Sequence, residues 1–261
     1  MRALNIAATG MKAQQLNVEV ISHNVANLNT TGFKRQRAEF QDLIYQNLER
    51  PGASTSSSGN ITPIGIQIGL GVKTSAISRS SEQGSIAGTE NPYDVAIAGR
   101  GFFQVTLPSG DTAYTRAGNF SLDAQGRLVT SDGFLIEPNI TVPNEAISVS
   151  IARDGTVEAT LSGNPQPQQL GQLELATFIN PAGLEAVGDN LLLETAASGQ
   201  PVVSAPGSPG VGTLQQNAVE ASNVNAVEEI SNLIEAQRAY ELNARIINAV
   251  DELLQAVNQI R

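Results

Sequence analysis

Hydrophobic positions at the two ends of the chain follow a helical repeat. Near the N-terminus they recur at alternating spacings of three and four residues, and the only polar member of the series is Gln14. The members of this N-terminal seam are Leu4, Ala7, Met11, Gln14, Val18, Ile21, Val25 and Leu28. Near the C-terminus the same spacing joins Ala239, Leu242, Ile246, Ala249, Leu253, Ala256 and Ile260. A repeat of this length is typical of the apolar seam of a coiled coil, so it predicts that the ends pair with each other or with other copies of the chain.

The C-terminal segment carries a second apolar stripe beside the first. Its members are Tyr240, Ile247, Val250, Leu254 and Val257. A two-stranded coiled coil needs only one narrow stripe, so the wider face predicts more than one neighbouring helix. An ordinary core helix of a globular domain stays open as the alternative.

The pattern between the two ends changes to short strands and tight turns. Apolar runs flank a turn at residues 99–101, a glycine-closed turn at residues 123–126 and the pair Asp154-Gly155. Such turn sequences between short apolar runs predict β-hairpins. Stretches rich in proline, glycine and serine precede and follow this region, and they are typical of extended linkers.

The sequence therefore predicts an α+β fold whose N- and C-terminal helices pair as a coiled-coil-like terminal domain. Residues 1–45 are expected to be its N-terminal helical segment, with a second amphipathic stretch at Phe40, Leu43, Ile44 and Leu48. Residues 46–66 are expected to form an extended linker or long loop, and residues 67–201 a central all-β domain. Residues 202–221 are expected to form a return linker and residues 222–261 the C-terminal helix, which Asn225 opens with a capping box.

Composition narrows the chemistry. The chain has no cysteine and one histidine, His23, so thiolate nucleophiles and multi-histidine metal sites are not expected. We expect no catalytic residue, no metal and no cofactor. A net charge of −10 argues against nucleic-acid binding. Lys34, Arg35 and Arg37 form a small basic cluster, interpreted as a solvated helix start or as a partner for acidic neighbours.

The beginning of the sequence lacks the pattern of a cleaved secretory signal, because polar residues interrupt every apolar run there. No stretch approaches the roughly 18 consecutive apolar residues of a membrane span, so membrane insertion is not expected.

Several motifs resemble those of the bacterial flagellar rod and hook proteins. They are SHNVANLNTTGFKR at residues 22–35, DVAI at 94–97, GFFQV at 101–105, AYTRAGNF at 113–120, EASNVN at 220–225 and AQRAYELN at 236–243. The family's pattern has an acidic residue at the position of Ala117. The resemblance marks Asn24, Asn27, Gly32, Phe33, Ser222, Asn223, Gln237, Arg238 and Tyr240 as family motif residues.

The resemblance implies a fold and a role. Such proteins build a terminal helical domain from both chain ends around an axial channel and carry an outer β-domain. They leave the cell through the flagellar export apparatus without a cleaved signal peptide. They polymerise into a tube that crosses the periplasm as a drive shaft. Implied partners are other copies of the chain, other rod proteins, the hook protein, and the P- and L-ring proteins.

Within the family, the length and residues 42–54 most resemble distal rod subunits, and a proximal rod or hook subunit stays the alternative. Two alternatives come from other classes. One is a β-domain that binds or hydrolyses cell-wall glycan and oligomerises through its helices. The other is a membrane-surface protein, although the termini lack the lysine-rich polar faces that such proteins use.

Overall fold

The computed structural model describes residues 2–49, 64–162 and 164–259, and they belong to two compact units. The helical unit comprises Met1–Ala26, Gln36–Ser78 and Asn225–Arg261. The β unit comprises Asn27–Arg35 and Arg79–Val224. The chain therefore passes between the units several times, and these divisions differ from the expected boundaries.

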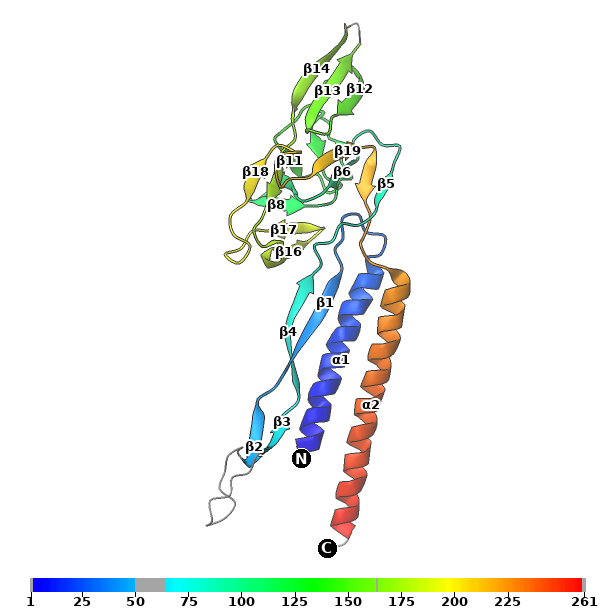
Figure 1. Cartoon of the computed structure of the whole chain (residues 1–261). Coiled ribbons are helices and arrows are strands. Elements are labelled where there is room, and N and C mark those ends of the chain that lie inside the picture. The colour runs from blue at the N-terminus through cyan, green and yellow to red at the C-terminus, as the bar shows by residue number, and fades with distance from the viewer. Residues whose placement is uncertain (1, 50–63, 163, 260–261) are drawn as a thin grey trace. The chain divides into compact units, whose positions relative to one another are not determined.

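Two long helices dominate the helical unit: α1 spans Arg2–Ala26 and α2 spans Ala226–Gln259 (Figure 1). They run antiparallel, because Asn24 contacts Glu229 while Gly10 lies against Asn243. Asn225 caps α2: its Oδ1 accepts hydrogen bonds from the backbone N–H groups of Val227 and Glu228 at 3.0 and 3.5 Å. Both expected helices are confirmed, and they contact each other along their length. Coiled-coil packing between them stays a prediction.

A strand ribbon completes the helical unit. Its strands are β1 (Gln36–Asp42), β2 (Tyr45–Glu49), β3 (Ile66–Gly69) and β4 (Val72–Arg79), paired as β1–β4 and β2–β3. The expected helical character of residues 36–45 is therefore wrong. A few apolar residues at helical spacing do not outweigh pairing with a partner strand about 30 residues later. Of the expected linker 46–66, residues 46–49, 64 and 65 and the start of β3 are described, and residues 50–63 lie outside the described residues.

Gly71 brings this ribbon against α1. It has φ +116°, and a Cβ atom there would overlap the side chain of Thr9. The hydroxyl of Thr9 in turn accepts a hydrogen bond from the N–H of Val72 at 3.3 Å. Only glycine combines this backbone conformation with so close an approach.

Short strands build the β unit. The largest sheet has seven strands in the order β16-β17-β8-β7-β11-β10-β9, and β12-β13-β14 form a second sheet of three. Three strand pairs complete it: β15–β18, β19–β6 and β20–β5. The bounds are β5 Ile86–Gly88, β6 Val95–Ala98, β7 Phe103–Thr106, β8 Thr112–Thr115, β9 Ser121–Leu122, β10 Leu128–Val129, β11 Leu135–Glu137, β12 Ala146–Ile151, β13 Thr156–Leu161, β14 Asn164–Gln172, β15 Leu175–Thr177, η1 Pro181–Gly183, β16 Glu185–Gly188, β17 Leu191–Leu193, β18 Val202–Ser204, β19 Thr213–Gln216 and β20 Ala218–Glu220.

Two of the three expected hairpins are confirmed. β9 pairs with β10 around Gly126, which has φ +78°, and β12 pairs with β13 around Gly155, which has φ +87°. The strands flanking residues 99–101 also exist but do not pair with each other. β6 pairs with β19, while β7 pairs with β8 and β11.

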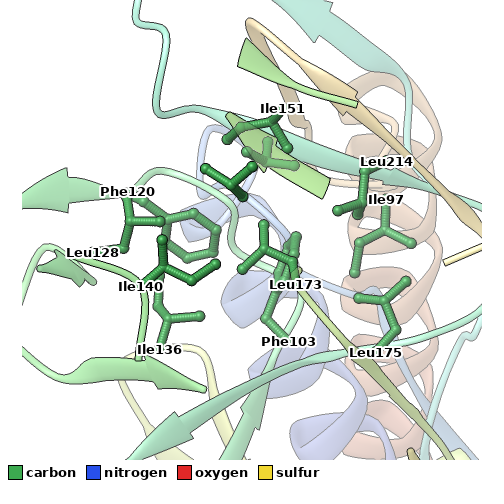
Figure 2. Packing of buried hydrophobic residues seen from close by; sticks show 12 residues of the cluster. Ile97, Phe103, Phe120, Leu128, Ile136, Ile140, Ile151, Leu173, Leu175 and Leu214 are labelled. Carbon is green, nitrogen blue, oxygen red and sulfur yellow. The ribbon is translucent and has the colours of Figure 1, made fainter. Parts of the chain in front are cut away.

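The hydrophobic core of the β unit draws on many of these strands (Figure 2). Its buried members are Val95, Ile97, Phe103, Phe120, Leu128, Ile136, Ile140, Ile151, Val157, Leu173, Leu175 and Leu214. Leu214 lies within the expected return linker 202–221. That expectation is wrong as a description of local structure, because β18, β19 and β20 all fall inside it and pair with remote strands.

Candidate assembly surface

The two apolar stripes of α2 have different surroundings. Ile247 and Val250 are half-buried, and they share the face that carries buried Ala236 and the close approach of Asn243 to Gly10. In the other stripe, Leu242, Ile246 and Leu253 remain 58%, 47% and 66% exposed. The middle of the second stripe, at Ile247 and Val250, therefore lies on the half-buried side of α2, whereas these three residues of the first stripe are exposed.

The far end of α2 extends beyond α1. The contacts of Asn24 with Glu229 and of Gly10 with Asn243 fix the antiparallel register. Because both helices advance equally per residue, the start of α1 lies level with about residue 251 of α2. Leu253 and Leu254 lie past that level and are both exposed. Ala256 is exposed too; the side chain of Val257 and all of Ile260 lie outside the described residues.

The N-terminal seam is only partly buried. Ala7 and Ile21 are buried, Leu4, Met11, Gln14, Val18 and Leu28 are half-buried, and Val25 is exposed. The buried face of α1 also includes Ala13, Val20 and Asn24, which the seam leaves out. This face is broader than a single seam because α1 packs on both α2 and the ribbon. On α2, Ala239 is half-buried and Tyr240 is exposed.

Further large apolar side chains of the helical unit are exposed outside the two terminal seams. Val227, Ile230 and Ile234 are exposed on the first turns of α2. Ile44, Tyr45, Leu48 and Ile66 are exposed on and beside β2 and β3. Large exposed apolar patches are common at sites of protein association.

Asn24 ties three elements of the helical unit together. Its Nδ2 donates to the backbone O of Gln36 at 2.8 Å and to Oε2 of Glu229 at 3.1 Å. Its Oδ1 accepts from the N–H of Gln36 at 2.9 Å. The buried amide thus joins the end of α1, the start of β1 and the first turn of α2, and no other side chain offers this donor and acceptor geometry at that length.

The other polar motif residues gather in the β unit. Gly32 has φ +71°, and its N–H donates to the backbone O of Glu220 at 2.7 Å. Asn223 accepts from the N–H of Arg35 at 2.6 Å and donates to the backbone O of Glu82 at 3.0 Å. Motifs almost 190 residues apart are therefore hydrogen-bonded to each other.

The remaining motif residues have smaller roles. Asn27 accepts from the Thr30 hydroxyl at 3.1 Å, and the Ser222 hydroxyl accepts from the N–H of Val224 at 3.3 Å. Phe33 is buried. Gln237, Arg238 and Tyr240 are exposed on α2.

The described parts of the chain show little that resembles a reaction centre. No group of three or more histidine or acidic side chains among them is placed to hold a metal ion. Neither α1 nor α2, as far as it is described, has the length and apolar character needed to cross a bilayer. A cavity of about 210 Å³ in the β unit is lined mainly by hydroxyl and amide side chains, among them Thr115, Asn119 and Ser131.

Comparisons with known proteins identify the family of the chain. Three family models match: flagella basal body rod protein at residues 4–34, flagellar hook protein FlgE/F/G D1 domain at residues 96–159, and flagellar basal body rod FlgEFG protein C-terminal at residues 215–260. The flagellar basal-body rod protein FlgG of Caulobacter vibrioides is 58% identical over 261 residues, which cover 100% of both chains. The chain belongs to the flagellar basal-body rod protein family.

Other members of the family show how evenly the likeness extends. FlgG of Agrobacterium fabrum is 50% identical over 99% of each chain, and FlgG of Buchnera aphidicola subsp. Baizongia pistaciae is 49% identical over 98% of each. As a family member, the chain is a structural component of the flagellar basal-body rod.

The matched segments also coincide with the polar network. The N-terminal family model covers Asn24 and Gly32, and the C-terminal one covers Glu220, Asn223 and Glu229. The hydrogen bond of Asn24 with Glu229 in the helical unit and that of Gly32 with Glu220 in the β unit therefore join one family segment to the other.

Proposed function

We propose that the chain is a subunit of the distal rod and polymerises with copies of itself into a helical tube. The observation that carries this proposal is the exposed stripe of Leu242, Ile246 and Leu253, together with the overhang of α2 beyond α1. A stripe that faces away from the chain's own α1 offers a heterologous contact, and repeated heterologous contacts generate open helical polymers. In the tube, α1, α2 and helices of neighbouring subunits would pack as in a coiled coil.

The relatives named FlgG favour the distal rod over the proximal rod and the hook. In this role the tube would act as a drive shaft across the periplasm and as a channel for exported subunits. Its ends would meet other rod proteins and the hook protein. The P- and L-ring proteins would surround it, and the flagellar export apparatus would deliver the subunits.

We further propose that the role is purely structural. A rod subunit performs its task by binding other subunits, and the helical unit exposes large apolar side chains that such binding uses. Incubation of the purified chain with peptidoglycan should release no soluble fragments. Turnover would support the rival interpretation of a glycan hydrolase.

A single thiol can report the proposed interface, because the chain has no cysteine of its own. Leu253→Cys, labelled with an environment-sensitive fluorophore, should shift its emission to the blue when the protein is concentrated into polymers. Asn248→Cys, at an exposed polar position of the same helix, is the matched control and should shift much less.

Two outcomes of this experiment contradict the proposal in different ways. If sedimentation and electron microscopy show no polymer at any concentration, the self-assembly is wrong. If polymers form while the label at position 253 stays in water, the stripe is not the interface.

A further inference from the structure

Glu220, the last residue of β20, is a buried carboxylate with an unusually full set of donors. Its side chain is 0% exposed. Oε1 accepts from Nζ of Lys34 at 2.5 Å and from the N–H of Gly84 at 2.9 Å. Oε2 accepts from Nε of Arg116 at 2.9 Å and lies 2.6 Å from its Nη2. The carboxylate is therefore shared by two cations and one backbone amide.

The two cations reach further into the β unit. Nζ of Lys34 also donates to the backbone O of Glu82 at 2.7 Å. Nη1 of Arg116 donates to the carbonyl oxygens of Gly99 and Gly101 at 2.8 and 2.7 Å. Burial lowers the pKa of Lys34, the contact with Glu220 acts in the opposite direction, and Arg116 lowers it further. The three side chains form one polar cluster, which we call the Glu220 triad.

The triad lies where the chain leaves the β unit. Lys34 belongs to the segment that follows α1, and Glu220 to the segment that precedes α2. Backbone hydrogen bonds reinforce the same place: Gly32 donates to Glu220 O at 2.7 Å, and Ala221 donates to Ser85 O at 2.8 Å. One carboxylate thus anchors both segments.

The backbone around the triad is packed too closely for ordinary side chains. A Cβ atom at Gly32 would lie 2.7 Å from the N atom of Ala117. A Cβ atom at Gly84 would overlap the carbonyl oxygen of Ala221. Close backbone packing without side chains leaves these segments little room to shift while the hydrogen bonds are intact.

Stability alone does not explain a buried triad. Replacing a buried ion group by well-packed apolar residues is often neutral or stabilising, because desolvation offsets the attraction between the charges. Ionic hydrogen bonds differ from apolar contacts in being directional, and the planar fork of Arg116 fixes geometry at several acceptors at once.

We propose that the Glu220 triad is a lock that holds both segments, residues 32–35 and 220–223, against the β unit. Its part in the polymer rests on the proposed rod function. A rotating rod carries load through the chain segments that connect the parts of each subunit, and the lock would keep residues 32–35 and 220–223 from shifting under that load.

Hydrogen exchange on the monomer tests the lock without any polymer. Lys34→Met keeps the ion pair of Glu220 and Arg116, whose charges cancel. Glu220→Gln would instead leave two buried cations without a counter-charge and risks unfolding. In Lys34→Met, the amides of Gly32 and Ala221 should exchange about tenfold faster than in the parent, since a hydrogen bond to a charged group is lost. Amides of the core strand β7 should keep their parent rates.

Asp123→Asn is the matched control, because it removes one charge from the partly exposed pair of Asp123 and Arg127 at 2.7 Å. It should leave exchange in both locked segments unchanged. Equal acceleration across β7 and the two segments in Lys34→Met would make the triad a general stabiliser and overturn the proposal. Unchanged exchange in the segments would overturn it as well.

The polymer supplies the second test. Rods assembled from Lys34→Met should have a shorter bending persistence length in electron micrographs than rods from the parent or from Asp123→Asn. Equally stiff rods from a variant with released segments would refute the mechanical part of the proposal. If even the parent forms no rods, the rod function fails while the exchange result still decides the lock.

Discussion

Ile246→Asp separates the stability of the subunit from its assembly. In the single chain Ile246 is about half exposed, so a carboxylate there can stay in water. Isoleucine and aspartate have similar helix propensities, so α2 should persist. We expect the melting curve of the monomer to change little, with a loss of at most about 1 kcal/mol from reduced apolar contact.

In the polymer the same substitution should be far more costly. If a neighbouring subunit covers the stripe, each copy must bury an unpaired carboxylate, which costs about 3–5 kcal/mol. Each 1.4 kcal/mol changes an association constant tenfold, so the critical concentration for polymerisation should rise by about a hundredfold to a few thousandfold. Asn248→Asp adds the same charge at an exposed polar position and should change the critical concentration by less than about threefold.

Sedimentation of polymer over a concentration series measures this critical concentration, and circular dichroism of the dilute protein checks the fold. Polymers that form from Ile246→Asp at the parent concentration would mean that the stripe faces solvent in the tube. Unfolding of the dilute variant would instead mean that Ile246 supports the subunit itself. Either result would refute the assignment of this stripe to assembly.

Two further substitutions and one titration test other parts of the chain. Asn24→Ala removes a buried amide that holds Glu229, and chemical denaturation should show a loss of about 2–4 kcal/mol; a loss below 1 kcal/mol would contradict this role. Gly84→Ala would drive a Cβ atom into a carbonyl oxygen and should lower the melting temperature by several degrees, whereas Gly88→Ala, with its nearest atom at 3.9 Å, should not. Hydrogen bonds from the backbone N–H and the hydroxyl of Thr156 lower the pKa of Asp154. The ionised carboxylate therefore stabilises the fold above its ordinary pKa, and this stabilisation is lost as the pH falls through the lowered pKa. Carboxyl NMR titration should place that midpoint below 3.8.

The long helices and two hairpins were predictable because their signals are local. The 3,4 repeat found α1 and α2, and Asn225 marked the start of α2 correctly. Gly126 and Gly155 occupy the left-handed backbone region that their turns require. In each case the residues that determine the structure lie within a few positions of it.

The strands that the sequence did not predict pair with segments far away in the chain. β1 pairs with β4 about 30 to 40 residues later, β2 pairs with β3 about 20 residues later, and β18, β19 and β20 pair with strands far back in the chain. Their sequences are short, and the nearby prolines and glycines of the return segment are equally compatible with a loop. Local periodicity does not report strand pairing over such distances, and for this reason the sequence predicts a linker where the structure has strands.

The sequence does not predict the Glu220 triad, for a related reason. The basic cluster was interpreted either as a solvated helix start or as a partner for acidic neighbours, and the second interpretation is confirmed for Lys34. No helix begins there, since β1 starts at Gln36. Glu220 itself ends a three-residue strand, and a single glutamate in such a position is more often exposed than buried. Only the family motif drew attention to it.

Several polar residues of this chain are buried, and several large apolar residues are exposed. Asn24, Glu229 and Glu220 are buried, while Leu242 and Leu253 are exposed. Hydrogen-bond networks are directional and can be completed within one chain, so they can define the subunit before it meets a neighbour. Apolar area is not directional and gains its free energy only when something covers it, so it can wait for the next copy. Changes to these buried polar residues should therefore act first on the subunit, and changes to the stripe should act mainly on the polymer.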